Sequence, residues 1–197
     1  TRSVRAIQRG QAIFAMTASF HRCEEGLSHH VKMPEVPPPD ELRGELELVR
    51  EHADELPRGL REVLTQDRPL DFRPTDGLHP FQLRTKDPKR CVWVRTVGEM
   101  DDDHLHHQAV LAYASDYGLL GAALQPHGLV FHDPQVMLAS LDHAIWFHRP
   151  FRVDEWLLYV VESPASAGAR AFSRGTFYTR DGTLVASTAQ EGLLRVR

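Results

Sequence analysis

The apolar residues of this chain gather in short segments near both ends, and a glycine turn divides each group into two. The paired segments are residues 4–8 and 12–20 around Gly10, and residues 171–178 and 184–196 around Gly182. Short apolar and β-branched segments joined by a tight glycine-containing turn are typical of β-hairpins. The pattern therefore predicts a hairpin at each end, and superposing Gly10 on Gly182 gives a weak internal repeat.

Between the hairpins, proline content and apolar spacing set the prediction for each segment. Residues 33–40 carry four prolines that remove backbone donors, which predicts an extended connector. Asp40 is a candidate N-cap for a helix with apolar residues at helical spacing over residues 42–49, and residues 56–64 predict a second short helix. The strand candidates are residues 70–73 and 91–96, with a polar loop over residues 75–90 between them.

The longest predicted helix covers residues 103–124 and places a carboxylate among apolar side chains. At about 100° per residue these side chains form one stripe, and Asp116 falls near its centre. The stripe consists of Leu105, Ala109, Ala112, Leu119, Leu120 and Ala123. Burying an unpartnered carboxylate destabilises a fold. We therefore expect Asp116 to be hydrogen-bonded, and it is a candidate functional residue unless it lies at a solvated rim.

Composition and charge exclude several classes of protein. With 197 residues, 42% apolar content and a net charge of -4, the chain can bury a core and has no broad attraction for nucleic acid or an anionic membrane. It contains neither an apolar run of about 18 residues nor a signal-peptide pattern at its start. Cys23 and Cys91 are too isolated for a disulfide framework, so we expect buried free thiols in a cytoplasmic protein.

Residues 138–151 place a hydroxyl, a carboxylate and two imidazoles on one strand-like segment, Leu-Ala-Ser-Leu-Asp-His-Ala-Ile-Trp-Phe-His-Arg-Pro-Phe. This segment resembles the second-module signature of the type II acyl-CoA thioesterases, and the resemblance extends from Arg5 to Arg195. The supporting matches are residues 111–116, 124–128, 155–159 and 185–192. The resemblance implies an α+β hot-dog fold, in which an antiparallel sheet wraps around a long central helix, as part of a double hot-dog.

The resemblance also implies a division of the chain. Residues 1–27 correspond to the terminal strands of a first hot-dog module, residues 28–68 to a linker with short helices, and residues 69–197 to the second module. Because the chain begins at Thr1 and lacks most of a first module, we expect an upstream segment or a second chain to complete it. The expected partners are an acyl-CoA substrate and a homo-oligomer or that second chain, with neither nucleic acid nor membrane.

In the family, an aspartate, a hydroxyl residue and a glutamine hold the water that attacks the thioester, and the matching positions are Asp116, Ser140 and Gln190. The carboxylate can accept a proton from water, the hydroxyl can donate and accept, and the amide can fix the water's orientation. The hydroxyl residue here is serine rather than the threonine of bacterial members. No Gly-x-Ser-x-Gly elbow surrounds Ser140, so hydrolysis without a covalent acyl-enzyme is expected.

Alternative interpretations remain open from the residues. A hot-dog enoyl-CoA hydratase would need an acid–base pair such as Asp142 and His143, although alternating strand side chains would put these on opposite faces. A non-catalytic acyl-CoA-binding module would keep the fold without turnover.

No metal or organic cofactor is expected, because the histidines lack a metal-ligand spacing. His143 and His148 are instead candidates for supporting hydrogen bonds. The candidate CoA-phosphate contacts are Arg149, Arg152, Arg170 and Arg174, which a solvated strand face explains equally well.

Overall fold

The computed structural model describes residues 1–22, 24–77, 81, 85 and 87–197. The chain divides into two compact units, Thr1–His30 and Val31–Arg197, which are described separately. Cys23 and parts of the predicted loop over residues 75–90 lie outside the described residues. Within the described part of the chain, no helix is both long and apolar enough to cross a membrane.

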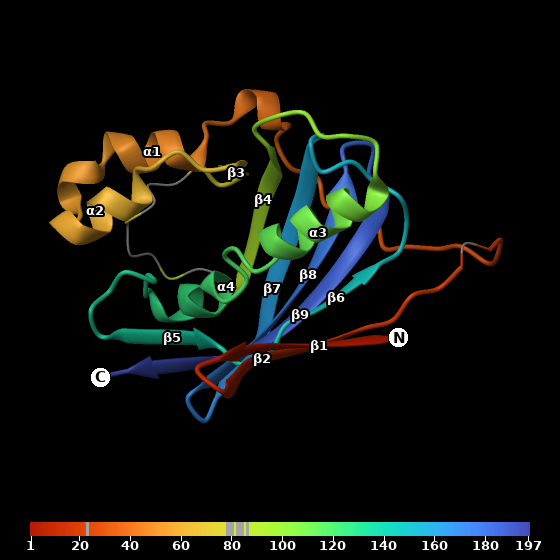
Figure 1. Cartoon of the computed structure of the whole chain (residues 1–197). Helices are drawn as coiled ribbons and strands as arrows, with labels where there is room; N and C mark the ends of the chain where they lie inside the picture. The colour runs from red at the N-terminus through yellow and green to blue at the C-terminus, as the bar shows by residue number, and fades with distance from the viewer. Residues whose placement is uncertain (23, 78–80, 82–84, 86) are drawn as a thin grey trace. The chain divides into compact units, whose positions relative to one another are not determined.

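The first unit contains the predicted N-terminal hairpin. Its strands β1 (Arg2–Gln8) and β2 (Gln11–Ala18) pair with each other in antiparallel register (Figure 1). Arg9 and Gly10 at the turn have φ angles of 50° and 79°, the left-handed conformation that tight hairpin turns require. The prediction of a hairpin is confirmed. Several large apolar side chains on this unit are exposed, namely Val4, Ile7, Ile13, Phe14, Met16 and Phe20.

The second unit is built on an antiparallel sheet. Its strands follow the order β3-β4-β7-β8-β9-β5, and β6 pairs with β9 on the same edge as β5 (Figure 1). The strands are β3 (Leu70–Pro74), β4 (Lys89–Thr96), β5 (Val136–Ser140), β6 (Ala144–Phe147), β7 (Leu157–Ala167), β8 (Arg170–Thr179) and β9 (Leu184–Val196). The predicted C-terminal hairpin is β8–β9, and the predicted sheet class is confirmed.

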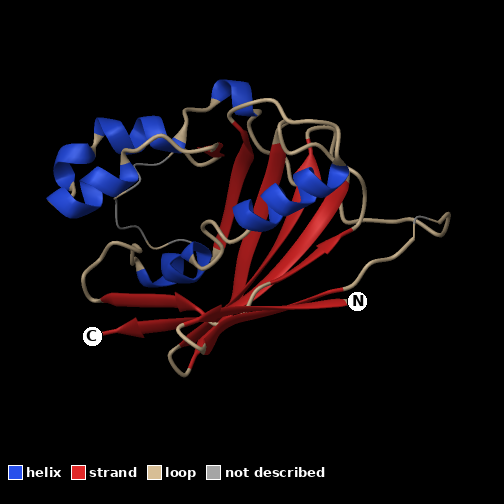
Figure 2. Cartoon of the chain, viewed as in Figure 1, coloured by secondary structure: helices blue, strands red, loops and turns tan. Residues whose placement is uncertain are grey.

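The central helix is shorter than predicted. Helix α3 (His104–Ala114) ends where a series of turns begins, and the short helix α4 (Gly121–Leu124) follows. Gly118 lies in these turns with a φ of 72°, a left-handed conformation that breaks helical geometry. The prediction of one helix over residues 103–124 is therefore wrong, although α3 does lie across the strands (Figure 2).

The predicted apolar stripe is wrong along α3 but correct beyond it, because Leu119, Leu120 and Ala123 are buried. Leu105 is 51% exposed, whereas His107, Leu111 and Ala114 face the core. The His107 Nε2 lies 2.9 Å from the Asp101 carbonyl oxygen, and its Nδ1 accepts a hydrogen bond of 3.0 Å from the backbone N–H of Val153. A satisfied histidine can thus occupy a core position, and apolar periodicity alone does not detect such a position.

Helices and sheet enclose the main core. Leu111 and Leu119 pack in one cluster with Val94, Tyr159 and Phe177 of the strands. The rings of Tyr159 and Phe177 are stacked with centroids 3.9 Å apart. This packing fixes the end of α3, next to the candidate site, against the sheet.

The proline-rich connector packs against a second apolar cluster of the sheet. Met33, Val36 and Leu42 contact a cluster that includes Trp93 and Trp156, and the Trp93 indole donates a hydrogen bond of 2.9 Å to the Pro37 carbonyl oxygen. Short helices follow along the chain: η1 (Pro39–Glu41), α1 (Glu45–Glu51), η2 (Ala53–Glu55) and α2 (Arg58–Leu64).

Asp40 does not cap the first α-helix. Helix α1 begins at Glu45, and the residue at its N-cap is Gly44. The Asp40 carboxylate forms an ion pair with Arg180 instead. The prediction of an Asp40 N-cap is wrong because residues 39–41 form a 3₁₀ turn before the chain turns into α1.

Candidate functional site

Asp116 lies just beyond the end of α3, at the exposed surface rather than in the core. Ser115 is the C-cap residue, and its backbone N–H still bonds to the Leu111 carbonyl, whereas Asp116 is in the turn that follows. Since Asp116 is exposed, the sequence argument for a buried carboxylate at the centre of an apolar stripe is wrong. Asp116 instead lies at the solvent-exposed edge of the apolar stripe, which is the alternative that the sequence left open.

A break between β5 and β6 presents the second group of site residues. Both strands pair with β9, but the chain leaves the ladder over residues 141–143. The Asp142 carboxylate accepts the Glu191 backbone N–H at 2.7 Å, and the Leu141 N–H donates to the Glu191 carbonyl at 2.9 Å. The Asp142 side chain thus accepts a backbone hydrogen bond that a neighbouring strand would otherwise accept. Ser140 precedes the break, and His143 lies at its end.

The structure brings the three sequence-predicted site residues together. The Gln190 amide nitrogen donates to the Ser140 hydroxyl at 2.7 Å, and that hydroxyl donates to an Asp116 carboxylate oxygen at 3.4 Å. Gln190 is only 1% exposed, whereas Ser140 and Asp116 are exposed. A buried amide is thus connected to a solvent-facing hydroxyl and carboxylate, a set that can hold one water and accept its proton.

Ser115 and His143 extend this hydrogen-bond network behind Gln190. The His143 Nδ1 lies 2.8 Å from the Gln190 amide oxygen, and its Nε2 lies 2.7 Å from the Ser115 hydroxyl. The sequence predicts a supporting role for His143 without naming its partner, and it does not predict a role for Ser115. A signal was present, since Ser115 adjoins Asp116 and His143 follows Ser140 by three residues.

A buried tyrosine anchors the end of α3 from the other side. The Tyr159 hydroxyl donates to the Ser115 carbonyl oxygen at 2.8 Å and lies 2.9 Å from the Thr188 hydroxyl. Burial raises the pKa of Tyr159 well above its usual value, so the hydroxyl stays protonated and available as a donor. Gly175 leaves the space that the Tyr159 ring occupies, because a Cβ there would lie 2.3 Å from ring atom Cε2.

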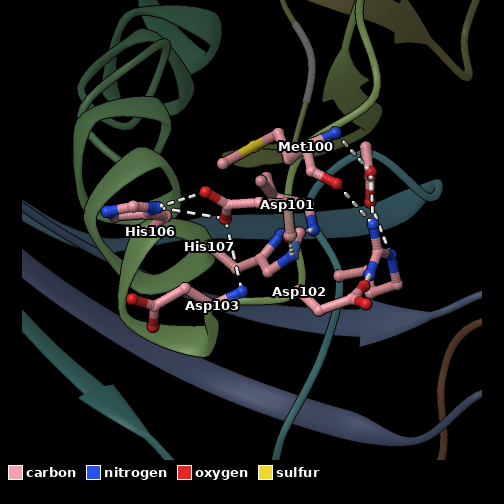
Figure 3. A network of polar contacts seen from close by, with 9 residues as sticks. Met100, Asp101, Asp102, Asp103, His106 and His107 are labelled. Carbon is pink, nitrogen blue, oxygen red and sulfur yellow. Dashed lines mark hydrogen bonds and ion pairs between the residues drawn. The ribbon is translucent and has the colours of Figure 1, made fainter.

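An acidic network holds the start of α3 (Figure 3). The Asp103 side chain caps the helix by accepting the Leu105 N–H at 2.9 Å. The hydrogen bond between Asp101 and His106 lowers the pKa of Asp101 and raises the pKa of His106. Arg152 donates to Asp154 at 2.8 Å, and this contact holds the pKa of Asp154 below its usual range.

The arginines considered for CoA phosphates all contact other groups of the protein. Arg152 belongs to the network at the start of α3, and Arg149 donates to the Leu184 carbonyl oxygen at 2.7 Å. Arg170 pairs with Glu191, and Arg174 pairs with Glu162. Within the described ranges, no cluster of three His, Cys, Asp or Glu side chains could hold a metal ion.

An open apolar pocket of about 440 Å³ lies along α3. Its lining residues are Pro69, Leu70, Thr96, Val97, Gly98, Ala109, Val110 and Tyr113. The Tyr113 hydroxyl lies 3.0 Å from the hydroxyl of Tyr117, the residue after Asp116. This hydrogen bond raises the pKa of Tyr117. Tyr113 therefore lines the pocket and also bonds to the residue that follows Asp116 in the chain.

Comparison with known proteins places this chain in a family. The family model described as acyl-CoA thioesterase matches residues 60–193. The human protein acyl-coenzyme A thioesterase 8 is 38% identical over 204 residues, which cover all of this chain and 63% of the relative. The chain thus spans less than two thirds of that relative's length.

Solved structures give a similar result. Acyl-CoA thioesterase II TesB2 from Mycobacterium marinum is 38% identical, with a TM-score of 0.75, over 99% of this chain and 68% of that chain. A conserved protein of unknown function with a hot dog fold from Alicyclobacillus acidocaldarius has a TM-score of 0.74 at 20% identity, over 99% of this chain and 67% of that chain. The predicted hot-dog fold is confirmed.

Proposed function

Because this chain belongs to the acyl-CoA thioesterase family, we propose that it carries the site at which acyl-CoA is hydrolysed to a free fatty acid and CoA. The proposal rests on one observation: the side chains of Asp116 and Gln190 both form hydrogen bonds with the Ser140 hydroxyl. A carboxylate acceptor, a hydroxyl and an amide donor are the groups that a water-attack mechanism uses.

In this mechanism Asp116 acts as the general base. The oxygen of a water bound by Asp116 and Ser140 attacks the thioester carbonyl carbon, while its proton passes to the carboxylate. The Gln190 amide holds Ser140 by a hydrogen bond of 2.7 Å and so orients the water. The C–S bond then breaks, and the leaving CoA sulfur takes up the proton that Asp116 accepted from the water. No bond to Ser140 forms in this sequence of steps.

We also propose that the apolar pocket along α3 receives the acyl chain, which would favour medium to long chains. Its volume of about 440 Å³ and its apolar lining suit a hydrocarbon chain. We expect Ala109→Phe to lower kcat/KM for long-chain acyl-CoA severalfold more than for short-chain acyl-CoA. Gln108→Phe adds the same ring outside the pocket lining and serves as the control. An equal loss at all chain lengths would exclude this pocket.

Asp116→Asn tests the role of the general base. We expect kcat to fall by about 100-fold or more with little change in KM, because the carboxylate acts mainly in the transition state. Asp142→Asn is the matched control. Its amide oxygen can still accept the Glu191 N–H, so kcat should stay near the wild-type value. Wild-type turnover in Asp116→Asn would remove Asp116 from the mechanism.

The full-length protein should also be assayed for its reaction type. Release of free thiol from acyl-CoA indicates hydrolysis, whereas loss of the double bond of enoyl-CoA without thiol release indicates a hydratase. Binding without either change indicates an acyl-CoA-binding module. The hydratase alternative is disfavoured because Asp142 bonds the Glu191 backbone while His143 contacts Ser115 and Gln190.

We propose that a further hot-dog unit, from an upstream segment or a second chain, covers the exposed face of the site. Large apolar side chains near the site residues in sequence are open to solvent, including Tyr113, Leu141 and Trp146.

We also propose a reducing compartment such as the cytoplasm. Cys91 is a half-buried free thiol whose pKa is raised by burial, and it would remain reduced there.

A further inference from the structure

A chain of hydrogen bonds connects the end of α3 to the proposed water site. It runs from Ser115 to His143 at 2.7 Å, to Gln190 at 2.8 Å, to Ser140 at 2.7 Å and to Asp116 at 3.4 Å. Ser115 and Gln190 are buried, and Tyr159 holds the Ser115 carbonyl, so this end of the chain is fixed.

The direction of the protons along this chain decides which end of the Gln190 amide faces Ser140. A neutral imidazole has one N–H and one acceptor nitrogen. If Ser115 donates to Nε2, then Nδ1 carries the proton and donates to the amide oxygen. In the opposite arrangement Nε2 donates to Ser115, whose proton turns to the Ala112 carbonyl 2.8 Å away, and the amide oxygen would face Ser140.

We infer that Ser115 and His143 are positioning residues that hold the Gln190 amide with its NH₂ group toward Ser140. An ionised Asp116 can only accept, so Ser140 must donate its one proton to it and accept a hydrogen bond from another group. The amide NH₂ supplies that donor. An amide oxygen in its place would compete with Asp116 for the Ser140 proton.

This orientation has a chemical consequence at the site. The second N–H of the amide is free to donate to the attacking water or to the thioester oxygen as negative charge develops on it. An amide oxygen at the same position would repel that charge. The catalytic consequence rests on the proposed thioesterase function, whereas the orientation itself does not.

The tautomer of His143 tests the orientation without any assay of activity. In long-range ¹H–¹⁵N spectra of the ¹⁵N-histidine-labelled full-length protein, His143 is assigned by the signal missing from His143→Asn. We expect a proton on Nδ1. A doubly protonated His143 also agrees with the inference, because its Nδ1–H still donates to the Gln190 amide oxygen. In that state the Ser115 hydroxyl donates to the Ala112 carbonyl oxygen. A neutral His143 with its proton on Nε2 would overturn the inference.

Activity tests the positioning role with matched variants. His143→Leu should lower kcat about tenfold with KM within about twofold, because the water is misplaced while binding is intact. In His143→Asn, the amide nitrogen lies near the Nδ1 position and should restore most of kcat. In His143→Gln, the amide extends toward the Nε2 position and should not restore kcat. Melting temperatures of the variants separate these effects from loss of folding.

A double-mutant cycle completes the test. If His143 acts through Gln190, His143→Leu should cause no further loss of kcat in a Gln190→Ala background. A further tenfold loss of kcat in the Gln190→Ala background would overturn the positioning role of His143. Unchanged kcat in His143→Leu alone would overturn it too. If the wild-type protein releases no thiol, the proposed function fails, and the tautomer still decides the orientation of the amide.

Discussion

Gly175 shows how a residue without a side chain supports the candidate site. It lies on β8 beside the Tyr159 ring, which is completely buried and stacked on Phe177. A Cβ at this position would lie 2.3 Å from the ring and 2.8 Å from the Thr188 hydroxyl. The ring has little room to move, so the hydroxyl that anchors Ser115 depends on this glycine.

We therefore expect Gly175→Ala to lower the free energy of unfolding by about 2–3 kcal/mol through overpacking of the core. Gly59→Ala is the control, because nothing lies within 4 Å of its Cβ position in helix α2. This control should be neutral or slightly stabilising. Urea unfolding measures both, and equal stability of the two variants would contradict the tight packing around Tyr159.

At the scale of elements, the start of α3 is held by charges, and its end is held by neutral hydrogen bonds. Asp101 and His106 pair at 2.9 Å on the exposed first turn. Ser115 and Tyr159 fix the last turn within the core. The bond between Ser115 and Tyr159 does not change with pH in the physiological range, since Tyr159 has a raised pKa.

The pH dependence of the first turn follows from the two pKa shifts. The raised pKa of His106 gives a contribution that is present below about pH 6.5 and lost as pH rises through the raised value. The lowered pKa of Asp101 gives a contribution that is present above about pH 4 and lost as pH falls through the lowered value. The pair is therefore most stabilising near pH 5.

We expect the stability difference between the wild type and His106→Gln to be largest near pH 5. It should shrink as pH rises through the raised pKa of His106 and as pH falls through the lowered pKa of Asp101, as measured by urea unfolding, which leaves the ionic strength unchanged. Asp101→Asn should give the same profile because it removes the other partner. A difference that does not vary with pH would show that the His106 ring acts by packing rather than by charge.

At the scale of the whole molecule, both compact units expose apolar surface. The unit Thr1–His30 is a single hairpin in the part of the chain that the structure describes, and an isolated hairpin is marginally stable in water. In the second unit Trp146 on β6 is 53% exposed. Exposed apolar patches and unpaired strand edges favour association with another surface.

We expect the 197-residue chain expressed alone to associate at micromolar concentration in sedimentation velocity experiments. A chain that starts at Val31 lacks the exposed hairpin and should sediment closer to a monomer. A stable monomer of the 197-residue chain with a cooperative melt would show that the hairpin needs no partner. This result would refute the proposal of a further hot-dog unit.

Local pattern predicted much of the fold because strands and turns depend on neighbouring residues. Alternating apolar segments around Gly10 and Gly182 identified both hairpins, and the spacing near Leu60 identified α2. The helix over residues 103–124 failed because apolar periodicity continues through Gly118, whose left-handed conformation is not visible in side-chain polarity. His107 likewise became a core residue through partners distant in sequence.

For the candidate site, the amino-acid sequence alone supplies the available chemical groups, and the family resemblance selects Asp116, Ser140 and Gln190 among them. The tertiary structure decided that these residues meet, since they come from a helix end, a strand break and a buried strand position. It also added Ser115 and supplied partners for His143, a candidate for supporting hydrogen bonds, across 28 and 47 residues of the chain. Hydrogen-bond partners depend on distances in space, and only the packing of α3 against the sheet sets those distances.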